Sequence, residues 1–490
     1  MARTPILTAE DIKVAFNLFC CMYGVGTLGM PGNFSRAGPV IAVCAMAFMA
    51  FANAYGAVAL CRVLLLAPSS VKTYGDLGEW VMGKTGRYLC VFAQILNSIL
   101  VPCVFLVLGG TLLDGLFPDA FSGSVWIILM AVTCLPVCLV PTLKEGAGAA
   151  FAGCMGTLIA DIIGVAVVMY GMRGHPSIPK PDLNFKQVVG AFGNLALAYG
   201  AGIVVPALHR QHSDPKRMPR VVGATMIFTS TCFLILASTA YSSVGCQIEG
   251  NLLWTIYPDS TTGLSALGFR SDWGAVVIAY LCMQLHITIA FSIILNPAFY
   301  LSERLFLGMH KVPVADVENN LQAQSYADAA TPNATAEKQV RPRQSYISVA
   351  DSENVHLGDP EAEAAEYRGS NAIKYIILRV VIVVILVVAS IAFKDHFSDL
   401  ADFAGASCIT LHSIILPIVF LLKKKWTSIP MWEKVPAVIA VVVCFVIGCY
   451  VTYTNGVNLF SPSDDGKEFS FCAPEYENTV YYNYTAVHGS

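Results

Sequence analysis

Runs of about twenty apolar residues, separated by short polar segments, recur along most of this 490-residue chain. An α-helix needs roughly that length to cross the hydrocarbon core of a bilayer. The pattern therefore predicts an all-α polytopic membrane protein with about eleven transmembrane helices. The predicted spans are residues 17–37, 39–66, 88–113, 124–143, 146–172, 188–208, 221–245, 273–306, 372–393, 400–422 and 435–454.

Polar segments divide these spans into groups. Residues 311–369 are rich in Ala, Glu, Asp, Ser, Asn and Gln, and such a composition cannot bury enough apolar surface to fold alone. We therefore expect spans one to eight within residues 1–310, a disordered cytoplasmic loop at 311–369, spans nine to eleven within 370–455, and an outer polar tail at 456–490.

The first span is a poor sequence for a continuous helix. Its centre reads Tyr23-Gly24-Val25-Gly26, and Gly29 and Pro31 follow. Each glycine lowers helix propensity by about 1 kcal/mol, and proline removes a backbone donor. The pattern predicts a helix broken in mid-membrane, whose freed backbone groups must face protein, a water-filled cavity or a ligand.

The sixth span, residues 188–208, repeats this device. Tyr199-Gly200-Ala201-Gly202 matches the Tyr-Gly-x-Gly of the first span, and Pro206 follows. Paired broken spans are the best sequence pointer to the midplane binding site of a secondary transporter. The Gly-x-Gly-x-x-Gly spacing that begins at Gly24 also matches a dinucleotide fingerprint, but the strand and βαβ unit that such a site requires are not predicted here.

Composition and charge agree with a membrane protein and orient it. The chain is 56% hydrophobic and 13% charged, and its mean hydropathy is +0.62. Most of its 30 Lys and Arg residues fall in segments on the side of the N-terminus, which is therefore predicted to be cytoplasmic. An odd number of spans places the tail outside, where Asn483 begins an acceptor sequon for glycosylation.

Most of the sixteen cysteines lie within the spans, without metal-ligand spacing, and are interpreted as small buried residues. Cys246 and Cys472 alone fall in predicted loops, on the same predicted side. We therefore take these two as a candidate disulfide.

Several of these motifs, taken together, resemble a known family. The run from Asn17-Leu18 through Gly24-x-Gly26-x-Leu28-Gly29-x-Pro31 is similar to the first-span signature of the amino acid/auxin permease family, within the amino acid–polyamine–organocation group. The sixth-span run 198–206, the Ala404-Gly405-Ala406 of span ten, and the long loop between spans eight and nine are similar too. The resemblance implies an inverted five-plus-five repeat with broken helices 1 and 6, alternating access, and proton- or sodium-coupled amino acid uptake.

An amino acid presents a carboxylate and an ammonium group, and the two breaks supply complements to both. The half-helix starting near Thr27 offers N–H donors and a positive dipole end to the carboxylate, and carbonyls of Tyr23, Gly24 and Tyr199 could accept from the ammonium. Each of these assignments has a structural alternative: close helix packing for the glycines, bonding to nearby backbone for Thr27 and Asn194, and ordinary packing rather than gating for Tyr199. The substrate-binding candidates are Tyr23, Gly24, Gly26, Thr27, Asn194, Tyr199, Gly200 and Gly202.

Ionisable residues inside spans are costly and point to function. Asp161 in span five is the first candidate for ion coupling, against a structural hydrogen-bonding role. His286 in span eight is a proton carrier or a packing residue, and Thr288 and Ser292 are candidate sodium ligands. Many relatives carry an acidic residue in the sixth-span break, where this chain has Gly200 and Ala201.

The sequence predicts a proton-coupled symporter of amino acids, with no organic cofactor, no bound metal, no nucleic acid partner and no enzymatic activity. We expect a monomer in the lipid bilayer of the plasma membrane, with the vacuolar or lysosomal membrane as the alternative. Transport of another small solute, such as an auxin-like acid or a polyamine, and an amino-acid-binding membrane sensor are the competing functions.

Overall fold

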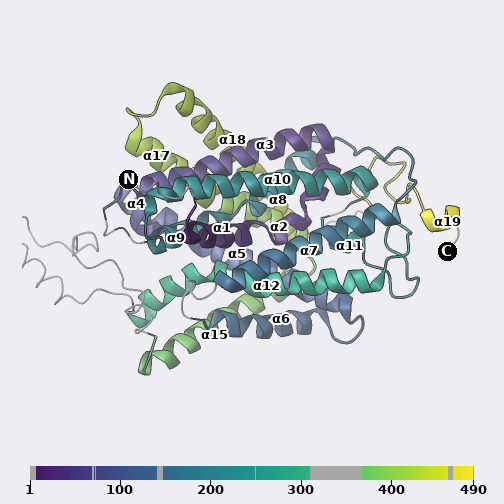
Figure 1. Ribbon diagram of the computed structural model, residues 1–490, viewed down its shortest axis with the longest axis horizontal. Helices are drawn as coiled ribbons and strands as arrows, with labels where there is room; N and C mark the ends of the chain where they lie inside the picture. Colours follow the sequence, from purple (N-terminus) through teal and green to yellow (C-terminus); the bar gives the residue numbers. More distant parts are fainter. Residues whose placement is uncertain are drawn as a thin grey trace, which may run out of the picture.

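Helices account for nearly all of the chain that the computed structural model describes (Figure 1). The described residues are 7–68, 71, 73–140, 147–248, 250–309, 367–461 and 467–488. Within these ranges there are isolated β-bridges but no strand. The predicted all-α class is therefore confirmed, whereas the predicted loop at 311–369 lies almost wholly outside the described residues.

The helices before residue 310 follow the predicted spans closely. They are α1 (Ala9–Met22), α2 (Val25–Leu28), α3 (Met30–Leu64), α4 (Tyr74–Met82), α5 (Lys84–Leu116), α6 (Gly123–Cys138), α7 (Ala147–Gly171), α8 (Phe185–Ala198), η1 (Ala201–Ile203), α9 (Val205–Gln211), η2 (Pro215–Arg217), α10 (Met218–Val244), η3 (Gly245–Gln247), α11 (Leu252–Thr255), α12 (Trp273–Ser302) and η4 (Glu303–Leu307).

The helices after residue 366 complete the bundle. They are α15 (Ser370–Ala392), α16 (Phe397–Ala404), the π-helical η6 (Gly405–Ile415), α17 (Leu416–Lys425), α18 (Met431–Phe460) and the short α19 (Tyr484–His488). The last predicted span ended at residue 454, but α18 continues to Phe460.

Nine helices in the described ranges are long and apolar enough to cross a membrane. The chain is thus a multi-pass membrane protein. The sixteen-residue α6 is shorter, and α1 has only 14 residues. Helix α3 contains the end of the first predicted span and most of the second, and a kink at Gly38, where φ is 70°, separates the two parts. The count of eleven spans and the inverted repeat remain predictions.

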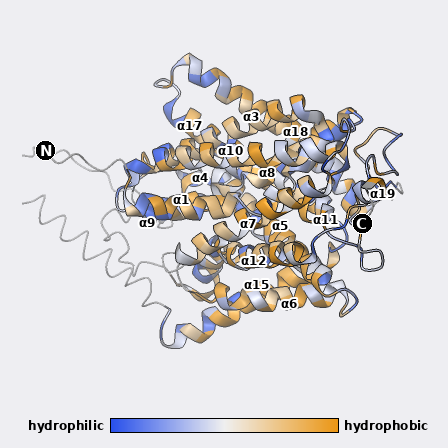
Figure 2. Ribbon diagram, turned by 45° about the vertical axis from the view of Figure 1, so that its right-hand side comes forward, coloured by the Kyte–Doolittle hydropathy of each residue, from blue (hydrophilic) through white to orange (hydrophobic). Residues whose placement is uncertain are grey.

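The long helices run roughly parallel, so that the bundle has two polar ends. Figure 2 shows hydrophobic residues along the middle of the helices and hydrophilic residues at both ends. The first turn of α1, α9 and the end of α17 lie at one end, which we call the N-terminal end, and α11 and α19 lie at the opposite, C-terminal end (Figure 1). This distribution is the one that a bilayer around the middle of the bundle would require.

The C-terminal tail lies across the C-terminal end of the bundle and is covalently fixed there. A disulfide joins Cys246, in η3, to Cys472 of the tail. The Gln247 side chain donates to the carbonyls of Tyr476 (3.1 Å) and Thr479 (2.7 Å). Asn483, the glycosylation candidate, accepts the backbone N–H of Ala486 at 3.0 Å.

Candidate functional site

The first break separates α1 from α2. After Met22, Tyr23 and Gly24 leave the helix and α2 begins at Val25, two residues before the predicted start. The last carbonyls of α1 and the first N–H groups of α2 therefore lack partners within their own helices. Between the two helices, the carbonyl of Gly24 is already engaged, because it accepts both the backbone N–H of Thr27 (2.9 Å) and its hydroxyl (2.6 Å). Thr27 thus bonds to nearby backbone, one of its two expected roles.

The second break separates α8 from α9. Helix α8 ends at Ala198, and the short η1 lies between it and α9. The carbonyl of Tyr199 accepts the N–H of Ala201 at 2.7 Å, and that of Leu197 accepts the N–H of Gly200 at 3.1 Å. Both predicted breaks are therefore present, and each is partly closed by local backbone bonds.

Glycines bring the two breaks into contact. A Cβ added to Gly26 would lie 2.6 Å from Cα of Ala198, and one added to Gly29 would overlap the amide of Asn194. Asn33 donates to the side-chain oxygen of Asn194 at 2.8 Å, across the two breaks. The close packing expected as one role of Gly26 is thus observed, and it brings the backbone of the two breaks together.

A small cavity lies beside the two breaks. Gly26 lines it from the first break and Gly200 from the second. No lining residue outside the breaks was predicted from the sequence. Among the lining residues outside the breaks, only Asn97 stands out in the sequence, because it is an amide within the apolar run of α5. The other lining residues come from α1, α2, α5, α8, η1, α12 and η6: Cys21, Met22, Val25, Asn97, Val101, Phe105, Leu197, Ile203, Ile294 and Ile409.

Asp161 lies on α7, next to the first break but outside the cavity lining. Only 2% of the residue is exposed, and both of its carboxylate oxygens lack a hydrogen-bond partner among the described residues. The hydroxyls of Tyr23 and Thr27 face it. A buried carboxylate is destabilising unless it is hydrogen-bonded, protonated or paired with a cation. The Asp161 side chain is therefore placed to accept a hydrogen bond, a proton or a cation.

The ring of His286 lies against the same break from α12. Its Nδ1 is 3.3 Å from the carbonyl of Gly153, which can only accept, so Nδ1 carries the proton. Its Nε2 is buried without a partner in the described structure, and a Cβ on Gly24 would overlap it. The hydroxyls of Thr288 and Ser292 donate to carbonyls of their own helix, at 2.8 and 2.9 Å.

Three other candidate residues lie outside the cavity lining. The Tyr199 hydroxyl donates to Ser230 on α10 at 2.9 Å, and the ring packs edge-on against Phe233. Tyr23 stacks between Phe233 and Phe19. A Cβ on Gly202 would lie 2.5 Å from the Ser413 hydroxyl of η6. These residues pack the breaks against neighbouring helices.

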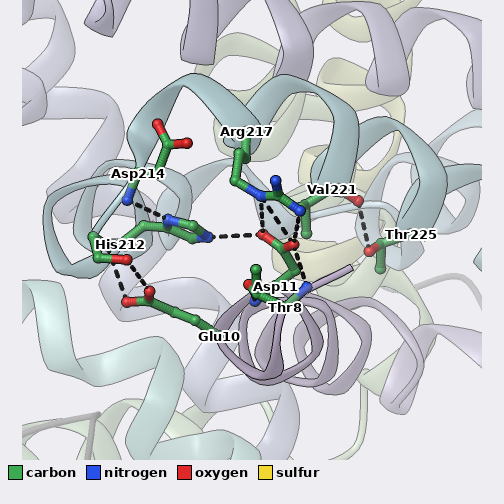
Figure 3. Close-up of polar contacts among 9 residues, drawn as sticks. Thr8, Glu10, Asp11, His212, Asp214, Arg217, Val221 and Thr225 are labelled. Atoms are coloured by element: carbon green, nitrogen blue, oxygen red, sulfur yellow. Dashed lines mark hydrogen bonds and ion pairs between the residues drawn. The ribbon is translucent and has the colours of Figure 1, made fainter. Parts of the chain in front are cut away.

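A polar cluster lies at the N-terminal end of the bundle, beside α1 (Figure 3). Asp11 belongs to the capping box of α1, with Thr8, and its carboxylate also accepts from Arg217 at 2.6 Å and from His212 Nε2 at 3.0 Å. His212 Nδ1 accepts the N–H of Asp214, which fixes the tautomer with hydrogen on Nε2. The Arg217 guanidinium holds the pKa of Asp11 well below its usual range. This cluster pins the start of α1 to the segment between α9 and α10.

A second ion pair lies toward the C-terminal end of the bundle, beside the tail. Arg36, in the first part of α3, donates to Asp402 of α16 at 2.6 Å and to the carbonyl of Gly190 at 3.2 Å. Its guanidinium also lies 4.9 Å from the ring centre of Phe471 in the tail. Both members of the pair are largely buried. Neither this pair nor the Asp11 cluster was predicted, because pairing across such long sequence separations leaves no local pattern.

Comparisons with known proteins agree with this architecture. The sequence model described as "Transmembrane amino acid transporter protein" matches residues 8–460. The chain is 24% identical to Amino acid transporter AVT1D of Arabidopsis thaliana over 257 residues, 49% of this chain and 44% of that protein. It is 22% identical to Vacuolar amino acid transporter 7 of Saccharomyces cerevisiae over 309 residues, 59% of this chain and 58% of that protein. The chain thus spans about half the length of these relatives.

One solved structure shows a shared fold. The crystal structure of MhsT in complex with L-phenylalanine superposes with a TM-score of 0.56, covering 92% of this chain and 100% of that one. The sequence identity is 10%. A likeness at this level concerns the fold alone.

Proposed function

Because this chain belongs to the transmembrane amino acid transporter family, we propose that it is a secondary active transporter that moves amino acids across a membrane by alternating access. The observation that carries the proposal is the contact between two broken helices beside a small cavity. Unpaired backbone at membrane depth is tolerated only where protein or a ligand satisfies it. An amino acid offers matching groups, since its ammonium donates and its carboxylate accepts.

The main-chain groups of the substrate would be held by the break itself. The free carbonyls at the end of α1, after Phe19, are acceptors for the ammonium group. The first N–H groups of α2, at Val25 and Gly26, are donors for the carboxylate. The carbonyl of Gly24 contributes less than the sequence suggested, because Thr27 already donates to it twice.

Asp161 is the proposed coupling residue, and a proton is the proposed coupling ion. Its carboxylate has no hydrogen-bond partner in the described structure and lies next to the first break. Protonation would neutralise it in its buried setting, so proton binding and the conformation of the break would be linked. His286 contributes a second unpaired acceptor at the same break. Sodium coupling through Thr288 and Ser292 is the alternative, and it would use hydroxyl oxygens that already donate within α12.

Alternating access requires that the two ends of the site open in turn. The Asp11 cluster holds the N-terminal end shut, and the Arg36–Asp402 pair holds the other. We propose that each contact breaks in one half of the transport cycle, so that the cavity opens to one side at a time. The N-terminal end would face the cytoplasm.

The membrane of residence is proposed to be the plasma membrane. The name of the yeast relative, a vacuolar transporter, favours an acidic organelle as the alternative. In either membrane the proton gradient would be directed toward the cytoplasm, as the proposed symport requires. The other two functions, carriage of a different small solute and amino acid sensing, are separated from this one by the experiment below.

The test is uptake of a radiolabelled amino acid mixture into proteoliposomes that contain the full chain and carry an imposed inward pH gradient, with and without sodium. We expect accumulation driven by the pH gradient alone. Accumulation that requires sodium would show that sodium, and not the proton, is the coupling ion. Binding without accumulation under either gradient would overturn transport in favour of sensing.

Two variants link uptake to the site. Gly26→Leu should abolish uptake, because its side chain would collide with the backbone of Ala198. Gly148→Leu on α7 is the matched control, since nothing lies within 4 Å of a Cβ there. Asp161→Asn should lose gradient-driven accumulation but keep exchange of labelled for unlabelled substrate. An Asp161→Asn protein that still accumulates substrate would contradict the coupling role.

A further inference from the structure

Most of the side chains that line the cavity beside the breaks are apolar. Val101 and Phe105 contribute to its wall from α5, Ile294 from α12, Ile203 from η1 and Ile409 from η6. Each of these residues is at least nine-tenths buried. Their side chains carry no hydrogen-bonding group, so a charged group that entered this wall would lose its water and find no partner.

Asn97 is the polar exception in the wall. It lies one helical turn before Val101 on the same face of α5 and is 3% exposed. Its Oδ1 is 3.7 Å from Sγ of Cys408, and that thiol also lies 3.1 Å from the carbonyl of Ala404. A thiol has a single proton and is a weak donor, so the Asn97 amide is only lightly engaged. It is uncharged, and it can serve a hydroxyl or amide on a substrate but cannot neutralise a charge.

The ionisable side chains near the breaks do not line this wall. Asp161 lies on α7, which contributes no residue to the cavity lining, and it faces Tyr23 and Thr27. The free nitrogen of His286 faces Gly24, on the side of the break that holds main-chain groups. His412 packs against the ring of Tyr74, with centroids 4.2 Å apart. A basic or acidic substrate side chain would therefore meet no counter-charge in this wall.

Resting on the transport function proposed above, we infer that this protein selects amino acids with uncharged, largely apolar side chains and excludes those with basic or acidic ones. The break recognises the ammonium and carboxylate common to all amino acids. The wall of Val101, Phe105, Ile203, Ile294 and Ile409 then receives the side chain. Phe105 is the largest of these residues, and it limits how bulky that side chain can be.

The first arm of the test compares substrates. Proteoliposomes with the full chain and an inward pH gradient are supplied in turn with labelled L-leucine, L-alanine, L-lysine and L-glutamate. Leucine or alanine should enter at least tenfold faster than lysine or glutamate. Lysine or glutamate entering as fast as leucine would overturn the inference while leaving transport intact. Entry of none of a complete amino acid panel would instead refute the transport function, and the inference with it.

The second arm changes the wall and measures a ratio, so that a loss of folded protein cancels. Phe105→Ala should raise the uptake of L-phenylalanine relative to L-alanine by roughly tenfold, because it makes room in the wall. Leu106→Ala is the matched control, since Leu106 is also buried on α5 but does not line the cavity. An unchanged ratio in Phe105→Ala, or an equal change in Leu106→Ala, would show that the substrate side chain lies elsewhere.

Discussion

The contact between Asn33 and Asn194 shows, at the scale of single residues, how the two breaks hold each other. Their 2.8 Å hydrogen bond is buried and joins residues 161 positions apart. The close approach that it needs is possible because Gly29 leaves space for the Asn194 amide. Asn194 was proposed as a substrate ligand from the sequence, but in this structure its side-chain oxygen already accepts a hydrogen bond from Asn33.

Removing this bond should destabilise the protein. Asn194→Ala leaves the Asn33 amide buried without its acceptor, which we expect to cost about 1 to 3 kcal/mol of unfolding free energy. The measurement is the apparent melting temperature in detergent. If the two residues act as a pair, the double variant Asn33→Ala/Asn194→Ala loses less than the sum of the single losses. Additive losses would mean that the bond contributes nothing.

At the scale of elements, the contacts of Asp11 hold α1 at one end. Its first turn is fixed by the Asp11 cluster (Figure 3), while its other end leads directly into the first break. Release of Asp11 would free α1 to move away from the segment between α9 and α10. Cys20 and Cys21, in the last turn of α1, are placed to report such a movement, because Cys21 lines the cavity.

Asp11→Asn should therefore expose the cavity from the N-terminal side. We expect faster labelling of Cys21 by a thiol reagent, followed by mass spectrometry of the peptide. Asp76→Asn is a matched control, because Asp76 has the same capping-box position in α4 but pairs with Arg304 rather than with Arg217. Equal labelling in Asp11→Asn and wild type would show that this cluster does not hold the end shut.

The ion pair of Asp11 with Arg217 should be insensitive to mild acidification. The Arg217 guanidinium lowers the pKa of Asp11 below its ordinary value of 3.8. A lowered pKa means that the stabilisation is fully present above that ordinary value and is lost only as the pH falls through the lowered one. Hydrogen exchange in the first turn of α1, corrected for the intrinsic rate, should be unchanged between about pH 7.5 and 5. Faster exchange at pH 5 would contradict this assignment.

At the scale of the whole molecule, the tail ties together loops that are distant in sequence. The carbonyl of Phe471 accepts from Asp182 and Gln187, both near the start of α8, and its ring lies under Arg36. The disulfide from Cys472 to Cys246 adds the end of α10 to the same assembly. One segment therefore touches elements on both sides of the proposed opening.

Removing the disulfide should make the tail more mobile. In Cys472→Ser we expect faster hydrogen exchange across residues 467–488 and a lower apparent melting temperature, since a disulfide closing a long loop typically stabilises by about 2 to 4 kcal/mol. Cys449→Ser, at an exposed free cysteine of α18, is the control. Unchanged exchange in the tail would mean that its hydrogen bonds alone hold it.

How well a feature could be predicted from the sequence depended on how far apart in the chain the interacting residues lie. Span positions and both breaks depend on local composition, and Gly24, Gly26, Gly200 and Pro206 marked them. The wall residues Val101, Ile294 and Ile409 could not be singled out, because an apolar residue facing a cavity and one facing lipid look the same in a sequence. The partners of Asp11 and Arg36 depend on tertiary contacts over hundreds of residues.

The fixed tail has a practical consequence for reporter design. Because the first turn of α1 and the tail lie at opposite ends of the bundle (Figure 1), labels attached near them would sit in different aqueous compartments. A pH-sensitive fluorophore near Thr8 and a second one near Tyr484 would read the acidity on the two sides of the membrane from a single molecule. Under the proposed proton coupling, their difference would give the driving force for uptake in a living cell while uptake itself is being recorded.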